Sequence, residues 1–157
     1  MQAIMDAVGT GRLDASVEVV ISDVPDAPAL ERARARGIPA VVVRRRDYSS
    51  RAEFETALAR AVEKAQPDLV VLAGFMRLLG PAFLDRFPCR VINIHPSLLP
   101  AFPGLEAQRQ ALEYGVKLTG CTVHYVDYWN HHRPARGGGY ARRRRGQPVG
   151  EDSRTGT

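Results

Sequence analysis

Cysteine is scarce in this sequence, and the marks of a membrane or secreted protein are missing. Only Cys89 and Cys121 occur in 157 residues, and neither belongs to a spaced set of Cys and His residues. Two isolated thiols predict neither a disulfide framework nor a metal site. No apolar run approaches the ~20 residues of a transmembrane helix, and the first residues lack the basic and apolar regions of a signal peptide. We therefore expect a cytoplasmic protein without a bound metal.

Excess charge of one sign is also absent from most of the chain. Residues 1–127 contain 15 basic and 15 acidic residues, whereas residues 128–157 contain 7 and 2, which accounts for the net charge of +5. A neutral first part argues against a nucleic-acid-binding surface. The basic tail has little aromatic interleaving, so a non-catalytic binding module is the weakest alternative. The expected partners are small molecules, with no nucleic acid and no membrane.

Strand and helix patterns alternate along residues 1–127, which are long enough for one domain. This alternation predicts an α/β class with a mainly parallel sheet flanked by helices. Strands are predicted over 17–22, 38–43, 69–73, 90–95 and 118–126, and helices over 1–8, 26–37, 50–66, 81–87 and 107–114.

Three local signals refine these elements. Asp26 is the predicted cap of the second helix, and Ser50 with Glu53 predicts a capping box at the third. The third helix should bury a stripe formed by Phe54, Leu58, Ala61 and Val62. The basic triplet at 44–46 reads as a solvated loop.

Asn93 and His95 form the strongest pair of candidate catalytic residues. They stand two positions apart on a predicted strand, so their side chains face the same side. They also lie at the strand's carboxyl end, where ligands bind in open α/β sheets. Histidine can donate or accept a proton near neutral pH, and an asparagine amide can stabilise an oxyanion during acyl transfer. A bare Asn-x-His would more often be an ordinary strand end.

The residues around Asn93 and His95 favour the catalytic interpretation over an ordinary strand end. The run from Asn93 to Pro100 reads Asn-Ile-His-Pro-Ser-Leu-Leu-Pro, is followed by Phe102-Pro103-Gly104, and resembles the signature of the folate-dependent formyltransferases. The stretch from Pro67 to Leu79 is also typical of those among them that formylate glycinamide ribonucleotide. Within this group the Pro after His95 and the Phe-Pro-Gly run favour the enzymes of purine synthesis that formylate glycinamide ribonucleotide. The resemblance extends from about Gln2 to Val126 and implies a Rossmann-like fold.

The resemblance also implies chemistry and ligands. The amine of glycinamide ribonucleotide would attack the formyl carbon of 10-formyltetrahydrofolate, a co-substrate, with Asn93 stabilising the oxyanion and His95 supplying a proton. Folate-binding positions would be Arg51, Asn93 and the segment Met76, Arg77, Leu78 and Leu79, with Leu78 and Leu79 as apolar walls. Without the resemblance, Arg51 reads as an exposed first-turn residue of a helix. No metal is implied, and a homodimer is left open.

Both ends of the chain depart from the resembled pattern. The family's first strand and Gly-rich phosphate loop would precede Gln2, so we expect an incomplete sheet with unpaired strand edges. After Asp127 the sequence fits a shifted reading frame, and residues 128–157 are predicted to be a disordered tail. A loop that carries an Asp orienting the catalytic His would be lost there, and Asp127 is either that Asp or the first residue of the loop. We accordingly expect little or no activity from the chain as written.

Two other enzymes share the signature. Methionyl-tRNA formyltransferases carry a further C-terminal domain, for which no sequence is present here. Formyltetrahydrofolate deformylases hydrolyse the folate instead of transferring its formyl group. These two activities, and a non-catalytic fragment, are the alternatives to the purine-synthesis activity.

Overall fold

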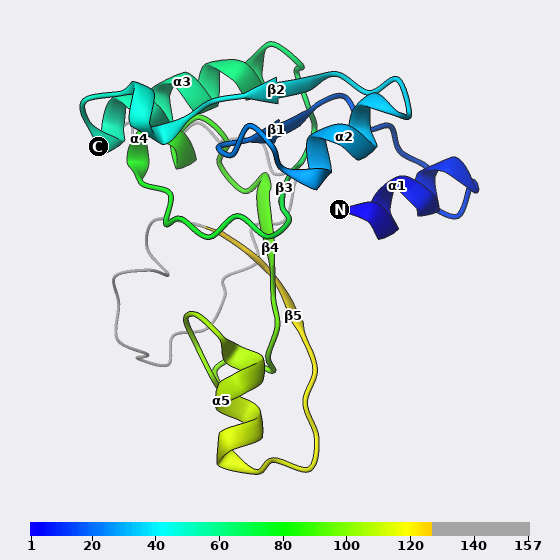
Figure 1. Cartoon of the computed structure of the whole chain (residues 1–157), viewed down its shortest axis with the longest axis vertical. Helices are drawn as coiled ribbons and strands as arrows, with labels where there is room; N and C mark the ends of the chain where they lie inside the picture. Colours follow the sequence, from blue (N-terminus) through cyan, green and yellow to red (C-terminus); the bar gives the residue numbers. More distant parts are fainter. Residues whose placement is uncertain (127–157) are drawn as a thin grey trace, which may run out of the picture.

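The structure, a computed structural model, describes residues 1–126 (Figure 1). Asp127 and the predicted tail 128–157 lie outside the described residues. The elements in chain order are α1 (Gln2–Gly9), β1 (Val20–Ser22), α2 (Pro28–Arg34), β2 (Ala40–Val42), a 3₁₀ turn (Arg45–Asp47), α3 (Arg51–Glu63), β3 (Val70–Leu72), α4 (Pro81–Leu84), β4 (Val91–His95), α5 (Ala107–Tyr114) and β5 (Thr122–Tyr125).

The strands confirm the prediction of an α/β fold with mainly parallel pairing. β1 pairs with β2 in parallel, β3 pairs with β4 in parallel, and β4 pairs with β5 in the antiparallel direction. Within residues 1–126 the two groups form separate sheets, with order β1-β2 and β3-β4-β5. β1 and β3 thus each pair on one side only. The strands are shorter than their apolar runs, because an apolar run also continues into the packed loops beside a strand.

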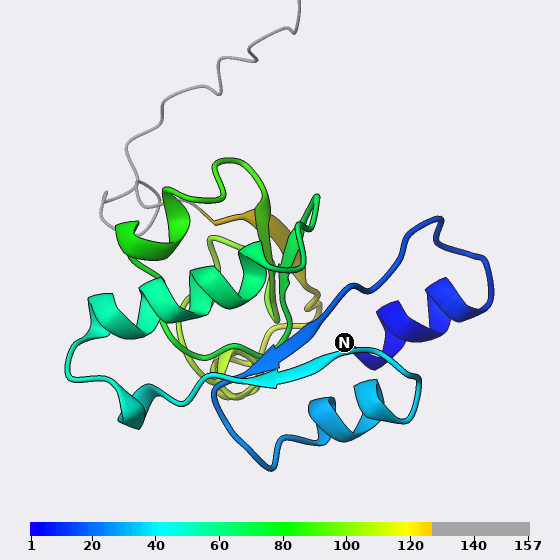
Figure 2. The same ribbon diagram turned by 90° about the horizontal axis from the view of Figure 1, so that it is seen from above.

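Alternating side chains of β1 and β2 pack against two helices, which lie on opposite faces of the strand pair. Val20 and Val42 pack in a small cluster with Leu30 and Ala33 of α2. Ile21 belongs instead to the main cluster, which includes residues of α3. This two-residue period places α2 on one face of the strand pair and α3 on the other (Figure 2).

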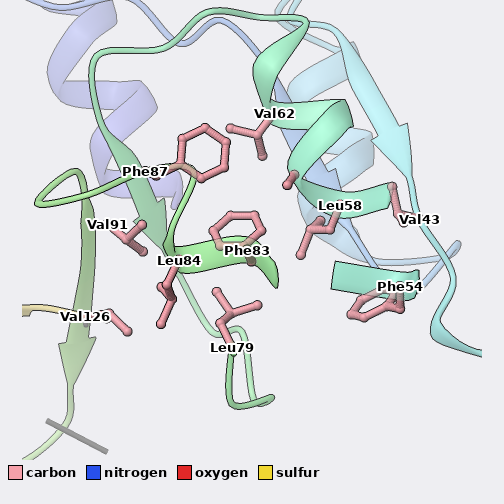
Figure 3. Packing of buried hydrophobic residues seen from close by; sticks show 11 residues of the cluster. Val43, Phe54, Leu58, Val62, Leu79, Phe83, Leu84, Phe87, Val91 and Val126 are labelled. Carbon is pink, nitrogen blue, oxygen red and sulfur yellow. The ribbon is translucent and has the colours of Figure 1, made fainter. Parts of the chain in front are cut away.

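The main core joins α3 to α4 and to the second sheet. In Figure 3, side chains of α4 and of the turn after it point toward α3 on one side and toward β4 on the other. The rings of Phe83 and Phe87 pack in a tilted arrangement at a centroid distance of 5.0 Å. The buried members are Val43, Phe54, Leu58, Ala59, Val62, Leu79, Phe83, Leu84, Phe87, Val91 and Val126. Burying a large apolar side chain contributes roughly 1.5–3 kcal/mol, so this cluster fixes α3 and α4 against β4.

The predicted capping box at the start of α3 is confirmed. The Ser50 hydroxyl accepts from the Glu53 backbone N–H at 3.1 Å, and the Glu53 carboxylate accepts from the Ser50 backbone N–H at 3.3 Å. The predicted stripe is correct at Phe54, Leu58 and Val62, but Ala61 is only partly buried. The helix also buries Glu55, a residue that hydrophobic periodicity cannot indicate.

Two loop predictions are wrong. The cap of α2 is Ala27, which makes no side-chain cap hydrogen bond, because Asp26 lies one residue too early. The 44–46 triplet is not simply solvated, because Arg44 and Arg45 are half-buried and only Arg46 is exposed. A 3₁₀ turn bends this segment, and Arg45 Nη1 donates to the Tyr48 carbonyl oxygen at 2.8 Å.

α5 and the lower half of β5 extend away from the rest of the molecule (Figure 1). α5 buries only two alanines, Ala107 and Ala111, while Leu112 and Tyr114 remain exposed. Gly115 ends the helix in the left-handed region at φ 78°, as the sequence predicts. No helix among residues 1–126 is both long and apolar enough to cross a bilayer.

Candidate active site

Asn93 and His95 lie on one face at the carboxyl end of β4. The register pairs Asn93 with His124 and His95 with Thr122 of β5, while Leu72 of β3 is the partner of Asn93 on the other side. Paired residues share a face of the sheet, so both histidines and Asn93 belong to the same side. The predicted juxtaposition of Asn93 and His95 is therefore present, although no hydrogen bond joins the two side chains directly within residues 1–126.

The Asn93 amide is oriented by a short chain of hydrogen bonds. His124 Nδ1 lies 3.1 Å from the Tyr125 carbonyl oxygen. Because a carbonyl can only accept, Nδ1 donates to it, and in the neutral ring Nε2 is then the acceptor. Asn93 Nδ2 lies 3.4 Å from that Nε2 and donates to it. Its second N–H is then available for another acceptor, which is the capacity that an oxyanion donor requires.

His95 is held by the loop that follows β4. Its Nε2 lies 2.9 Å from the Phe102 carbonyl oxygen and therefore donates to it. This contact leaves Nδ1 as the ring nitrogen for exchange with a ligand. Phe102 itself has φ 51°, and Gly104 has φ 82°, so the chain turns sharply beside the histidine. The predicted role of Gly104 in this turn is consistent with that positive φ.

Two hydroxyls fasten this loop to β5. Thr122 Oγ1 accepts from the Leu99 backbone N–H at 2.9 Å and donates to the Ser97 carbonyl oxygen at 2.8 Å. Ser97 is fully buried, and its hydroxyl donates to the carbonyl oxygens of Ala101 and Phe102. The Phe102 carbonyl oxygen thus accepts hydrogen bonds from both Ser97 and His95. The position of the His95 imidazole therefore depends on the conformation of this loop.

Arg51 and the segment Met76–Leu79 are brought together. Arg51 Nη2 donates to the Leu78 carbonyl oxygen at 3.0 Å, which links α3 to the segment after β3. Met76 and Leu78 are 75% and 62% exposed, whereas Leu79 is 4% exposed and belongs to the core. The expectation that Leu79 forms an apolar wall is therefore wrong for its side chain, although Leu78 is free to form one.

Glu55 organises this second part of the site. Its Oε1 accepts from Arg51 Nε at 2.6 Å and from the buried Gly80 backbone N–H at 2.9 Å. The residue is 2% exposed, so a carboxylate is buried with one cation and one backbone donor. Gly80 leaves room for it, because a Cβ there would stand 2.9 Å from Glu55 Oε2. Arg77 does not take part in this contact, because its Nε forms an ion pair with Asp23 Oδ2 at 2.6 Å.

Sequence reasoning missed Glu55, His124 and Thr122. Glu55 follows Arg51 by four residues, the spacing of a helical ion pair, but nothing in the sequence indicates its burial. His124 and Thr122 alternate on a predicted strand, and this alternation places them on one face. The pairing with β4 that brings them to Asn93 and His95 is not encoded locally.

Comparisons with known proteins identify the family of the chain. The sequence model described as formyl transferase matches residues 1–129. Phosphoribosylglycinamide formyltransferase of Escherichia coli is 45% identical over 126 residues, which cover 80% of this chain and 59% of the relative. The trifunctional purine biosynthetic protein adenosine-3 of Drosophila melanogaster is 46% identical over 129 residues, covering 81% of this chain and 10% of that protein.

A solved structure shows the same fold. Glycinamide ribonucleotide transformylase 1 of Symbiobacterium toebii superposes with a TM-score of 0.79 at 56% identity, covering 81% of this chain and 60% of that one. The chain thus spans about three fifths of the length of these two bacterial proteins. The extent of the family match and the level of identity together show that this chain belongs to the formyl transferase family.

Proposed function

We propose that the chain transfers a formyl group from 10-formyltetrahydrofolate to the amine of glycinamide ribonucleotide, a step of purine synthesis. The observation that carries the proposal is the placement of Asn93 and His95 on one face at the carboxyl end of β4. Relatives at 45% and 56% identity are named for this reaction. Because the chain spans only part of their length, the activity, substrates and partners are proposals for this protein.

The reaction makes two demands on the site. The substrate amine forms a bond to the formyl carbon, whose oxygen becomes an anion, and the bond from that carbon to the folate nitrogen then breaks. The attacking amine gives up a proton and the leaving nitrogen gains one. In this proposal the free N–H of Asn93 donates to the oxyanion. His95 Nδ1 takes the proton that the amine gives up and supplies it to the leaving folate nitrogen. Such contributions are typically ~10²–10³ in rate for an oxyanion donor and ~10²–10⁴ for a general acid.

The folate is assigned to Arg51, Asn93 and the segment Met76–Leu79. Exposed Met76 and Leu78 offer apolar surface beside backbone groups that can pair with a flat pterin edge. The Leu78 carbonyl already accepts from Arg51, so other backbone groups of the segment have to serve the pterin. We place the protein in the cytoplasm, expect no metal requirement, and leave a homodimer as an open expectation.

The proposal is tested with excess chain over formyl-labelled folate, in the presence and absence of glycinamide ribonucleotide. This single-turnover format detects slow transfer, which suits the expectation of a low rate. Label should appear in the glycinamide product. Release of formate at the same rate without the amine would instead indicate a deformylase and contradict the proposal.

Variants on β4 assign the chemistry. His95→Ala and Asn93→Ala should lower the single-turnover rate at saturation by at least ~10²-fold, because both interactions strengthen in the transition state. Ile94→Ala is the matched control, since Ile94 lies between them on the opposite, exposed side of the strand. A His95→Ala chain with the unchanged rate would end the assignment of His95 as the acid.

A further inference from the structure

Ser97 is a buried polar residue to which the proposed chemistry gives no role. Among residues 1–126 only Glu55 shares this class, and Ser97 is the more deeply buried of the two at 0% exposure. A hydroxyl removed from water needs a hydrogen-bond partner. That of Ser97 donates to the carbonyl oxygens of Ala101 and Phe102, and it has a single proton to share between them. The hydroxyl therefore ties together two successive residues of the loop after β4.

The Phe102 carbonyl oxygen is where this tie reaches His95. The oxygen accepts from His95 Nε2 at 2.9 Å and from the Ser97 hydroxyl at 3.3 Å. Phe102 has φ 51°, a left-handed conformation that a phenylalanine adopts only where neighbouring contacts hold it. The direction of this carbonyl is consequently set by the hydrogen bonds of the loop and not by the backbone preference of Phe102.

α5 supplies a second set of hydrogen bonds to the same loop. Gln110 Nε2 donates to the Pro103 carbonyl oxygen at 3.2 Å and to the Leu105 carbonyl oxygen at 2.7 Å. Both acceptors lie beyond Phe102 in the chain, so these two bonds hold the outer part of the loop and not the oxygen that His95 uses. The contributions of Ser97 and Gln110 can thus be separated by substitution.

We propose that Ser97 is a positioning residue for His95. Its hydroxyl holds the Phe102 carbonyl in the direction that accepts from Nε2, which keeps the proton of the neutral ring on Nε2 and leaves Nδ1 free to take a proton. The inference rests on the proposed function, in which Nδ1 carries the proton from the attacking amine to the leaving nitrogen. A ring with its proton on Nδ1 lacks the free lone pair for the first of these transfers.

The size of the effect follows from one neutral hydrogen bond. The loss of such a bond shifts a conformational equilibrium by about 2- to 10-fold. In the Ser97→Ala chain the ratio of Nδ1–H to Nε2–H forms of neutral His95 should rise by that factor, because the Phe102 carbonyl then turns away from the ring more often.

The ¹⁵N magnetic resonance spectrum of the imidazole rings measures this ratio without any substrate, at about pH 8.5, where histidine is ordinarily neutral. The His95 signals are identified by their loss in the His95→Ala chain. They should show Nε2 protonated in the unsubstituted chain and a larger Nδ1–H share in Ser97→Ala. His124, whose Nδ1 donates to the Tyr125 carbonyl oxygen, is the internal control and should not change. Gln110→Ala is the matched variant, since it removes two hydrogen bonds of the loop and should leave the His95 ratio unchanged.

Single-turnover formyl transfer tests whether the effect passes through the imidazole. Ser97→Ala should lower the rate by about 2- to 10-fold, because fewer chains hold the ring in the productive orientation. In the His95→Ala chain the same substitution should lower the rate no further, because a positioning residue acts only through the group that it positions. If Ser97→Ala does not fold, Ser97→Cys, whose thiol is only a weak donor, should shift the His95 ratio in the same direction.

The results separate the two proposals. A His95 ring with its proton on Nδ1 in the unsubstituted chain overturns the role of Ser97, and so does an unchanged ratio in Ser97→Ala. An equal change in Gln110→Ala, or a matching change at His124, also overturns it, because the effect would then be a general loosening of the loop or of the sheet. Equal rate losses from Ser97→Ala with and without His95 do the same. The expected ratios in a chain that transfers no formyl group support the positioning of His95 by Ser97 and contradict the proposed function alone.

Discussion

Removing Arg51 should destabilise the fold through Glu55 rather than through the loss of an exposed arginine. The Arg51 side chain is 56% exposed, and its ion pair with Glu55 is screened by solvent. The carboxylate of Glu55 is 3% exposed and would keep only the Gly80 N–H as a partner in the Arg51→Ala chain. A buried charge that loses one partner is costly, and with one donor retained we expect about 2 kcal/mol of lost stability.

The matched substitution Glu55→Gln removes the charge and retains an acceptor for Gly80. Its cost should be about 1 kcal/mol, because a neutral hydrogen bond replaces a charge-assisted one and Arg51 can turn to water. The double variant Arg51→Ala with Glu55→Gln should also lose about 1 kcal/mol, since no carboxylate is left buried without its cation. The second substitution thus partly rescues the first.

Urea unfolding of the four chains measures this coupling directly. Arg60→Ala on the same helix is the control for loss of an exposed arginine, with an expected cost below about 0.5 kcal/mol. If Arg51→Ala costs no more than Arg60→Ala, and if the Glu55→Gln cost simply adds to it, the reasoning from the buried carboxylate is refuted.

Three further predictions concern residues near the site. Ser50→Ala should cost about 1 kcal/mol in urea unfolding through the lost cap, whereas Ser49→Ala should leave stability unchanged, and equal effects would contradict the capping geometry. Leu79→Ala should lower the free energy of unfolding by about 2–5 kcal/mol, because it leaves a cavity in the core. Leu78→Ala should leave stability unchanged and weaken folate binding, and the reverse pattern would show that the two roles are exchanged. Thr122→Val should raise amide exchange at Leu99 by removing its acceptor, and Thr122→Ser should not, so unchanged exchange in Thr122→Val would refute the hydroxyl's role.

The elements that could be predicted from sequence are those specified by local signals. The capping box of α3 depends on two residues three positions apart, and the end of α5 depends on a glycine with positive φ. The placement of Asn93 and His95 on the same face follows from the two-residue period of a strand alone. In contrast, Asp26 shows that a good capping residue is not used when the helix begins one residue later.

The residues that escaped prediction act across long sequence separations. Glu55 meets Gly80 across 25 residues and Asn93 meets His124 across 31, so each contact exists only after strands and helices have packed. Both contacts involve polar side chains, and hydrophobic periodicity does not indicate where polar side chains are buried or paired. His95 was identified from its neighbours in sequence, but its orientation depends on Phe102, and that oxygen is in turn bonded by Ser97. A short motif can therefore indicate the group proposed for the chemistry, whereas the groups that hold it in position follow from the tertiary fold.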